Sequence, residues 1–292
     1  MNMEFEPIEF DRQQAYLQQL SQCDQVASDY SFVNLWGWRD AHGLRWAWHD
    51  DLVWILQTVP RKVLWAPVGN WKSADWEALW PILNAHGNQM IRIPEALLNI
   101  WRSTLASMPQ PVESREHWDY LYDRRDLVDL KGNKFHKKKN LVNQFKKKYA
   151  SSFLPFGSEM VEQAKGMQED WCTWRDCESH ETLAAENTVI TKVLDHWEQL
   201  DGVTGGALKV EDRLAAYTIA EDLPDGTLVI HFEKGDPEYK GSYQAINQMF
   251  LEQDPSPSTL VNREQDLGSE GLRKAKLSYH PVDFVRKYQI RL

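Results

Sequence analysis

Three β-rich runs between residues 207 and 233 constrain the fold of this chain more than any other stretch. The runs 207–210 and 214–219 flank a short polar turn, and an Asp225-Gly226 pair then leads into the run 227–233. An Asp-Gly pair between β-rich runs is a strong hairpin signal, because these residues adopt the positive φ angles that tight hairpin turns need. We therefore predict three consecutive antiparallel strands here.

The residues around these runs extend the pattern into a mixed half-chain. A helical pattern follows Gly241, and Gly268-Ser269-Glu270 opens a further helix. The predicted order of the second half is helix, strand, two helices, three strands, helix, strand, helix, strand. The bounds expected for the elements outside the three runs are about 134–149, 152–156, 158–175, 180–200, 259–262 and 284–291.

The first half has a similar order without visible sequence repetition. Its predicted strands lie at 44–48, 52–56, 63–65, 90–93, 112–113 and 117–122, and its predicted helices lie at 10–22, from Ser73 onward, and at 95–107. Two halves of similar size and order suggest two tandem domains, residues 1–128 and residues 129–292. A single large mixed sheet is the alternative.

The element order of the second half resembles the GNAT (N-acyltransferase) fold. Ala275 and Tyr279 have the four-residue spacing that many GNAT enzymes show near the end of the last helix. Residues 261–276 and the aromatic stretch 29–38 resemble, more specifically, a bacterial family of unknown function related to the C-terminal catalytic domain of phosphatidylglycerol lysyltransferases. This resemblance covers nearly the whole chain. It implies an α+β fold of two tandem GNAT-like domains, each a mixed, mostly antiparallel sheet flanked by helices.

Composition restricts the partners and the compartment. The net charge is −10, whereas nucleic-acid binders are usually basic. The three cysteines, Cys23, Cys172 and Cys177, lack a zinc-like spacing, so we expect reduced thiols, a cytoplasmic location and no metal site. No apolar run approaches the ~18 residues of a transmembrane segment. Eleven of the fourteen tryptophans precede Tyr120, which indicates an aromatic core or, alternatively, a substrate-stacking surface. The sequence indicates no oligomeric state.

A GNAT-like fold implies acyl transfer, with acid–base groups on the strand that lines the cleft. Glu233 and His231 alternate late in the third β-rich run, where either side chain could deprotonate an attacking amine. Tyr279 matches the position where many GNAT enzymes place a general acid. The structural alternatives are a surface strand position for Glu233 and a core tyrosine for Tyr279.

The GNAT fold usually holds coenzyme A on backbone amides at the start of the helix after the third hairpin strand. Aligned on Gly241, this sequence offers Lys240 and Ser242, but Glu238 places a negative charge and Tyr243 places bulk against an incoming pyrophosphate. We therefore expect no certain cofactor and weak or no binding of coenzyme A. The lysyltransferase resemblance implies another donor, an aminoacyl-tRNA.

Eight lysines between Lys131 and Lys148 form a positive footprint despite the negative total. They could contact RNA phosphates or anionic lipid headgroups, or form only a solvated helix face. The residues predicted to bind phosphate or RNA are Lys134, Lys137, Lys138, Lys139, Lys240, Gly241 and Ser242.

Polar residues also crowd the junction between the strand at 259–262 and the helix that follows. Convergent polar groups are typical of a binding site, although a self-neutralising surface cluster is the alternative. The predicted substrate-binding residues are Asn262, Arg263, Glu264, Asp266, Arg273 and Lys276. The sequence thus predicts transfer of an acyl or aminoacyl group to an amine or hydroxyl, from a small-molecule or aminoacyl-tRNA substrate. The alternative is a non-catalytic ligand- or nucleic-acid-binding protein on a degenerate GNAT fold.

Overall fold

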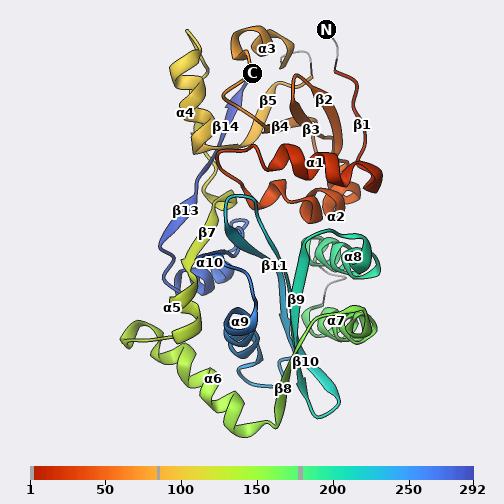
Figure 1. Ribbon diagram of the computed structural model, residues 1–292, viewed down its shortest axis with the longest axis vertical. Coiled ribbons are helices and arrows are strands. Elements are labelled where there is room, and N and C mark those ends of the chain that lie inside the picture. The colour runs from red at the N-terminus through yellow and green to blue at the C-terminus, as the bar shows by residue number, and fades with distance from the viewer. Residues whose placement is uncertain (1–2, 84–85, 177–179) are drawn as a thin grey trace. The chain divides into compact units, whose positions relative to one another are not determined.

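The computed structural model describes residues 3–83, 86–176 and 180–292. The chain divides into two compact units (Figure 1): unit 1 comprises residues 1–120, 264–274 and 283–292, and unit 2 comprises residues 121–263 and 275–282. The strands form two separate mixed sheets, so the expected α+β architecture is confirmed and the alternative of one large sheet is wrong. The division into tandem halves at residue 128 stays a prediction.

The sheet of unit 1 has seven strands in the order β1-β2-β3-β4-β5-β14-β6. Strands β1 to β4 are antiparallel neighbours, β4 and β5 are parallel, and β14 is antiparallel to β5 and β6. The parallel pair requires a crossover, which α3 (Trp76–Leu83) supplies. The strands span Glu6–Pro7 (β1), Arg45–His49 (β2), Leu52–Gln57 (β3), Val63–Gly69 (β4), Gln89–Pro94 (β5), Val112–Glu113 (β6) and Lys287–Arg291 (β14).

Tryptophans fill the interior of unit 1. The buried rings of Trp54, Trp76 and Trp101 meet edge to face, with centroid separations of 6.3 and 5.3 Å along the series. Because these large side chains are enclosed, they form the expected aromatic core and not a stacking surface. The remaining helices of this unit are α1 (Gln13–Leu20), α2 (Phe32–His42) and α4 (Glu95–Thr104), and β13 (Asp283–Val285) is a short strand.

The sheet that carries the three predicted strands runs through unit 2 in the order β7-β12-β11-β10-β9-β8. Strands β8 to β11 are antiparallel neighbours, β11 and β12 are parallel, and β12 is antiparallel to β7. This sequence of pairings matches the one from β1 to β5 in unit 1. The strands span Asp119–Asp123 (β7), Ser151–Pro155 (β8), Val203–Val210 (β9), Arg213–Asp222 (β10), Thr227–Gly235 (β11) and Leu260–Asn262 (β12).

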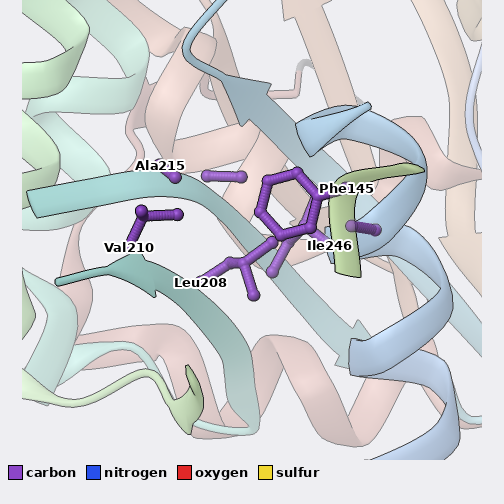
Figure 2. Packing of buried hydrophobic residues seen from close by; sticks show 7 residues of the cluster. Phe145, Leu208, Val210, Ala215 and Ile246 are labelled. Atoms are coloured by element: carbon purple, nitrogen blue, oxygen red, sulfur yellow. The ribbon is translucent and has the colours of Figure 1, made fainter. Parts of the chain in front are cut away.

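Helices cover both faces of the β9–β10–β11 hairpins, with α7 and α8 on one face and α9 on the other (Figure 1). Helix α6 packs on α9, and its Phe145 lies against Leu208 of β9 and Ile246 of α9 (Figure 2). The helices span Arg124–Asp129 (α5), His136–Lys148 (α6), Val161–Arg175 (α7), Glu181–Asp195 (α8), Ser242–Gln253 (α9) and Glu270–Leu277 (α10). Within the described residues, 3-10 turns lie at Phe10–Arg12, Ser28–Tyr30, Arg115–His117, Asn133–Phe135, Ser158–Met160 and Trp197–Gln199.

Two strands pair far from their sequence neighbours. Strand β14, expected to close the second half of the chain, pairs instead with β5, where Tyr288 lies opposite Ile93. Strand β7, from the first half, pairs with β12, where Tyr122 lies opposite Val261. Each sheet therefore contains a strand from the other half of the sequence.

Candidate functional site

Glu233 and Arg263 form the centre of a polar cluster in unit 2. The parallel pairing of β11 and β12 brings the end of β12, and hence Arg263, beside the strand that carries Glu233. The Nη2 atom of Arg263 donates to Oε1 of Glu233 at 2.9 Å, and Nδ2 of Asn247 on α9 donates to Oε2 at 2.8 Å. Both carboxylate oxygens of Glu233 therefore hold neighbouring side chains in place.

Three further predicted residues lie against Arg263 or its neighbours. The guanidinium of Arg263 lies 4.6 Å from the ring centroid of Tyr279, and the ammonium of Lys138 lies 4.2 Å from the same centroid. Lys276 donates from Nζ to the backbone oxygen of Arg263 and so orients the segment after β12. We call Lys138, Glu233, Arg263 and Tyr279 the unit 2 cluster.

Burial sets the protonation states in the unit 2 cluster. Burial raises the pKa of the Tyr279 phenol above its ordinary value, although the nearby Arg263 opposes this. Burial, reinforced by the charge of Arg263, lowers the pKa of Lys138. Burial opposes the charge on Arg263, but the Glu233 carboxylate prevails and raises the Arg263 pKa. At neutral pH the cluster thus presents a protonated phenol and a permanent guanidinium.

One nitrogen of Arg263 has no protein partner within the described residues. Its Nη1 atom is enclosed and makes no hydrogen bond of good geometry to the protein. A buried donor without a partner costs about 1–3 kcal/mol, and more when it carries charge. The arrangement therefore suits a ligand that brings an anionic or carbonyl oxygen to this nitrogen.

His231, the other predicted acid–base residue, lies in a closed part of the unit 2 sheet. Its Nε2 atom lies 3.2 Å from Oε1 of Glu221 on β10, and none of its side chain is exposed. The structure therefore places this imidazole against a second buried side chain and not at an open surface.

The predicted substrate-binding junction is divided between the units. Asn262, Arg263 and Lys276 belong to unit 2, whereas Glu264, Asp266 and Arg273 belong to unit 1.

In unit 1, Asp266 is a buried anchor. It accepts hydrogen bonds from Nε and Nη2 of Arg273, both at 2.8 Å, and from the hydroxyl of Tyr120 at 2.6 Å. Burial favours the neutral acid, but the hydrogen bonds from Arg273 and Tyr120 outweigh it and lower the Asp266 pKa to about 2. Its Oδ1 atom also accepts from the amide of Gly268 at 2.9 Å, which fixes the turn before α10. These contacts favour a structural role for Asp266.

Glu264 lies beside a network that the sequence analysis did not identify. It has a φ of 55° and accepts a hydrogen bond from Nδ2 of Asn34 at 2.8 Å. The next residue, Gln265, donates to Asp29 at 2.7 Å. A glutamate with a positive φ that accepts from Asn34, followed by a glutamine that donates to Asp29, marks a constrained loop, which is common at functional sites. Asp29 and Asn34 both belong to the stretch 29–38, whose family resemblance was the sequence signal that could have identified this network.

Asp29, which Gln265 of this loop contacts, belongs to a buried network of four charged side chains. Lys287 on β14 donates to Asp29 and, at 2.7 Å, to Asp119, and none of its side chain is exposed. Arg92 on β5 completes the set by pairing with Asp29. Burial raises the pKa of Asp29, but the charges of Arg92 and Lys287 outweigh it and hold the pKa well below its ordinary value. Two carboxylates and two cations balance in charge, so this network is paired throughout.

The start of α9 does not fit a coenzyme A pyrophosphate. Gly241 has a φ of 93°, and a Cβ there would lie 2.6 Å from the backbone oxygen of Leu141 on α6. The amide of Ser242 already donates to the oxygen of Tyr239 at 2.9 Å, and its hydroxyl donates to the oxygen of Asp236 at 3.1 Å. Carbonyl oxygens and a carboxylate thus surround amides that would have to face phosphate.

The predicted lysines divide into two groups. Lys137, Lys139 and Lys240 are exposed, and Lys134 is exposed but pairs with Asp126 at 2.7 Å. Lys138 instead faces Tyr279, as described above. The sequence analysis had placed the lysines of residues 131–148 together on one phosphate-binding helix face and Lys240 at the start of the next helix.

Within the described residues, no helix is long and apolar enough to cross a membrane. The same residues contain no group of three or more His, Cys, Asp or Glu side chains arranged to hold a metal ion. Cys23 is a free thiol, but Cys172 is disulfide-bonded, so the expectation of reduced thiols throughout is wrong. Cys177 lies outside the described residues.

The two sheets, each with an antiparallel series followed by a parallel pair, define a tandem GNAT-like, acyltransferase-like protein. The chain belongs to the family described as phosphatidylglycerol lysyltransferase, C-terminal, whose model matches residues 21–291. The predicted family resemblance and fold class are therefore confirmed.

Several solved structures and one sequence relative are similar to this chain. A conserved protein of unknown function from Bacteroides thetaiotaomicron is 30% identical, with a TM-score of 0.91 over 99% of both chains. The C-terminal domain of a candidate lysylphosphatidylglycerol synthetase from Agrobacterium fabrum is 10% identical, with a TM-score of 0.66 over 96% of this chain and 91% of that one.

L-PGS from Bacillus licheniformis is 14% identical, with a TM-score of 0.65 over all of this chain and 93% of that one. The likenesses to the Agrobacterium and Bacillus structures show the fold alone. An uncharacterised protein of Mycoplasmoides gallisepticum is 25% identical over 175 residues, which cover 60% of this chain and 56% of that protein.

Proposed function

We propose that this protein transfers an acyl or aminoacyl group to an amine or hydroxyl acceptor, and that the unit 2 cluster is its reaction site. The observation that carries the proposal is the enclosed Nη1 atom of Arg263, which has no partner within the described residues and lies beside Tyr279 and Lys138. Acyl transfer develops negative charge on a carbonyl oxygen, and fixed donors aimed at that oxygen stabilise it.

Each member of the cluster has a distinct part in this mechanism. Arg263, oriented by Glu233 at 2.9 Å, donates to the oxygen on which charge develops. Tyr279, whose raised pKa keeps its proton at neutral pH, donates that proton to the leaving oxygen. Lys138, whose pKa is lowered, accepts a proton from the attacking amine or hydroxyl more readily than an ordinary lysine.

Glu233 has both oxygens engaged, by Arg263 and Asn247. These two hydrogen bonds fix the carboxylate against Arg263 and Asn247. We therefore propose that Glu233 positions Arg263. Its role as a general base, expected from the sequence, stays a rival assignment that the same experiment tests.

The arrangement of α6 supports an aminoacyl-tRNA as the donor. Lys138 lies over the ring of Tyr279 in the unit 2 cluster, whereas its neighbours Lys137 and Lys139 are exposed on the same helix. A polyanion lying along the exposed lysines would bring its reactive end toward the cluster. Coenzyme A is the less suitable donor, because the start of α9 is surrounded by acceptor oxygens.

The proposal is tested by incubating the protein with total tRNA charged with radiolabelled amino acids, in the presence of a membrane lipid extract and, separately, of free amines. Transfer is measured as label that leaves the tRNA and enters a stable product. We expect Arg263→Gln to lower the rate about 10²–10³-fold, as loss of an oxyanion donor does. Tyr279→Phe should lower it about 10²-fold or more.

Matched controls make this result specific. Lys138→Gln should lower kcat, whereas Lys139→Gln, the same charge change at an exposed neighbour, should raise the KM for charged tRNA and leave kcat nearly unchanged. If Glu233 positions Arg263, Glu233→Gln raises KM and lowers kcat without altering the pH profile. If it is the base, the acidic limb of that profile disappears. Binding of charged tRNA without any transfer would instead establish the non-catalytic binding protein.

A further inference from the structure

Basic and amide side chains gather at one end of three neighbouring strands in the unit 1 sheet, β4, β5 and β14. Lys62 immediately precedes β4, Gln89 begins β5, and Arg291 ends β14. The antiparallel register sets Arg291 opposite Gln89, and the parallel register sets Leu64 beside Met90. Lys62 and Asn88 immediately precede β4 and β5, and both line the same cavity.

These residues surround a cavity of about 630 Å³. Its lining comprises Arg61, Lys62, Asn88, Gln89, Arg291 and Leu292. The volume lies within the range of about 300–1,000 Å³ that is usual for small-molecule sites. Three of the six lining side chains are cations and two are amides, so the side-chain donors suit an anion.

The charge of this cavity is not balanced by the protein. Within residues 3–83, 86–176 and 180–292, no carboxylate forms an ion pair with Arg61, Lys62 or Arg291. Exposed cations elsewhere in the same unit do find partners: Lys72 lies 2.6 Å from Asp24. Clustered like charges repel each other, so an unpaired group of cations is unfavourable without a bound anion. The chain has a net charge of −10, so carboxylates that could pair with these cations are plentiful.

We propose that this cavity is a second anion-binding site, for a ligand that carries phosphate groups. Arg61 and Arg291 offer planar guanidinium groups that bind phosphate oxygens in pairs, and Lys62 adds a point charge next to Arg61. The amides of Asn88 and Gln89 can donate to the remaining oxygens. The site belongs to unit 1 and is independent of the transfer reaction proposed for unit 2.

The test is calorimetry with inorganic pyrophosphate at low salt. We expect a dissociation constant below about 1 mM. Arg61→Gln, Lys62→Gln and Arg291→Gln should each weaken binding roughly tenfold, since a hydrogen bond to a charged group is worth about that factor. Lys72→Gln is the matched control, because it removes an exposed lysine of the same unit outside the cavity, and it should leave binding unchanged.

Absence of pyrophosphate binding, or equal binding by the triple variant and the unmodified protein, would overturn the proposal. Arg61, Lys62 and Arg291 are exposed, so replacing them should not unfold the protein. Thermal unfolding of each variant checks that weaker pyrophosphate binding does not come from a loss of folding. Flotation with phosphatidylglycerol vesicles distinguishes the source of the phosphate. Vesicle binding that the triple variant loses assigns a lipid headgroup, and pyrophosphate binding without vesicle binding assigns a soluble ligand.

Discussion

Replacing Lys287 by methionine tests the energetics of the buried charges in unit 1. The ammonium lies 2.7 Å from a carboxylate oxygen of Asp119 and also pairs with Asp29, with no exposure to solvent. At an effective dielectric constant of about 20, the attraction to Asp119 alone is about 6 kcal/mol. Desolvation of the ammonium offsets several kcal/mol of this. We therefore expect Lys287→Met to lower the free energy of unfolding by about 3–5 kcal/mol.

The loss should depend on pH in a defined direction. In the unmodified protein the pKa of Asp29 is held low, so its stabilising effect is complete above pH ~4 and disappears only as pH falls through that lowered pKa. Without Lys287, burial raises the pKa of Asp29 relative to the unmodified protein. A buried carboxylate without a cation partner destabilises the fold while it is ionised, as it is at neutral pH. Protonation at lower pH removes this charge and therefore its cost. The difference between variant and unmodified protein should therefore be largest near pH 7 and shrink toward pH 4.

Urea unfolding followed by tryptophan fluorescence measures this difference, because eleven of the fourteen tryptophans precede Tyr120 and so report on unit 1. Lys72→Met, at a side chain that is 70% exposed, is the control and should change stability by less than about 0.5 kcal/mol. Adding Asp119→Asn to Lys287→Met should recover about 1–2 kcal/mol, because it removes the uncompensated charge. A loss below about 1 kcal/mol at pH 7 would refute the reasoning.

Three further predictions concern unit 2. Replacing Lys137, Lys146 and Lys147 by glutamine should flatten the dependence of log K on log salt for tRNA binding by about two to three units; an unaltered slope in a filter-binding titration would place the RNA elsewhere. Gly241→Ala should destabilise the protein by about 1–3 kcal/mol in thermal unfolding, because φ is positive and the new Cβ would meet Leu141; an unchanged midpoint would contradict this. Calorimetry with acetyl-CoA should give weak or no binding, and a low-micromolar dissociation constant would mean that the α9 terminus opens to the pyrophosphate.

Local sequence signals were sufficient for most elements of the fold. The Asp225-Gly226 turn lies between β10 and β11 as predicted, because turn chemistry acts over a few residues. The partners of β7 and β14 were not predictable. Strand pairing across the chain depends on which sheet edge is free, and the alternation of side chains does not encode that edge.

The candidate site was predictable in its residue types but not in its grouping. Glu233, Arg263 and Tyr279 were all selected from the sequence, and the structure brings them together. Lys138 was assigned to a phosphate-binding surface, since nothing in a run of three lysines distinguishes the one whose helix face is half-buried. Lys287 was missed because a lone lysine in a terminal strand reads as an exposed residue.

The exchange of strands between the sheets has a consequence for how the molecule is made. Gln89 on β5 and Gln289 on β14 are joined by a side-chain hydrogen bond, although 200 residues separate them. Closing a loop of that length costs about 2–3 kcal/mol more than closing one of about ten residues. During synthesis this edge of β5 therefore stays unpaired until residues 287–291 have been made. An open strand edge of this kind is where a nascent chain aggregates or recruits a chaperone.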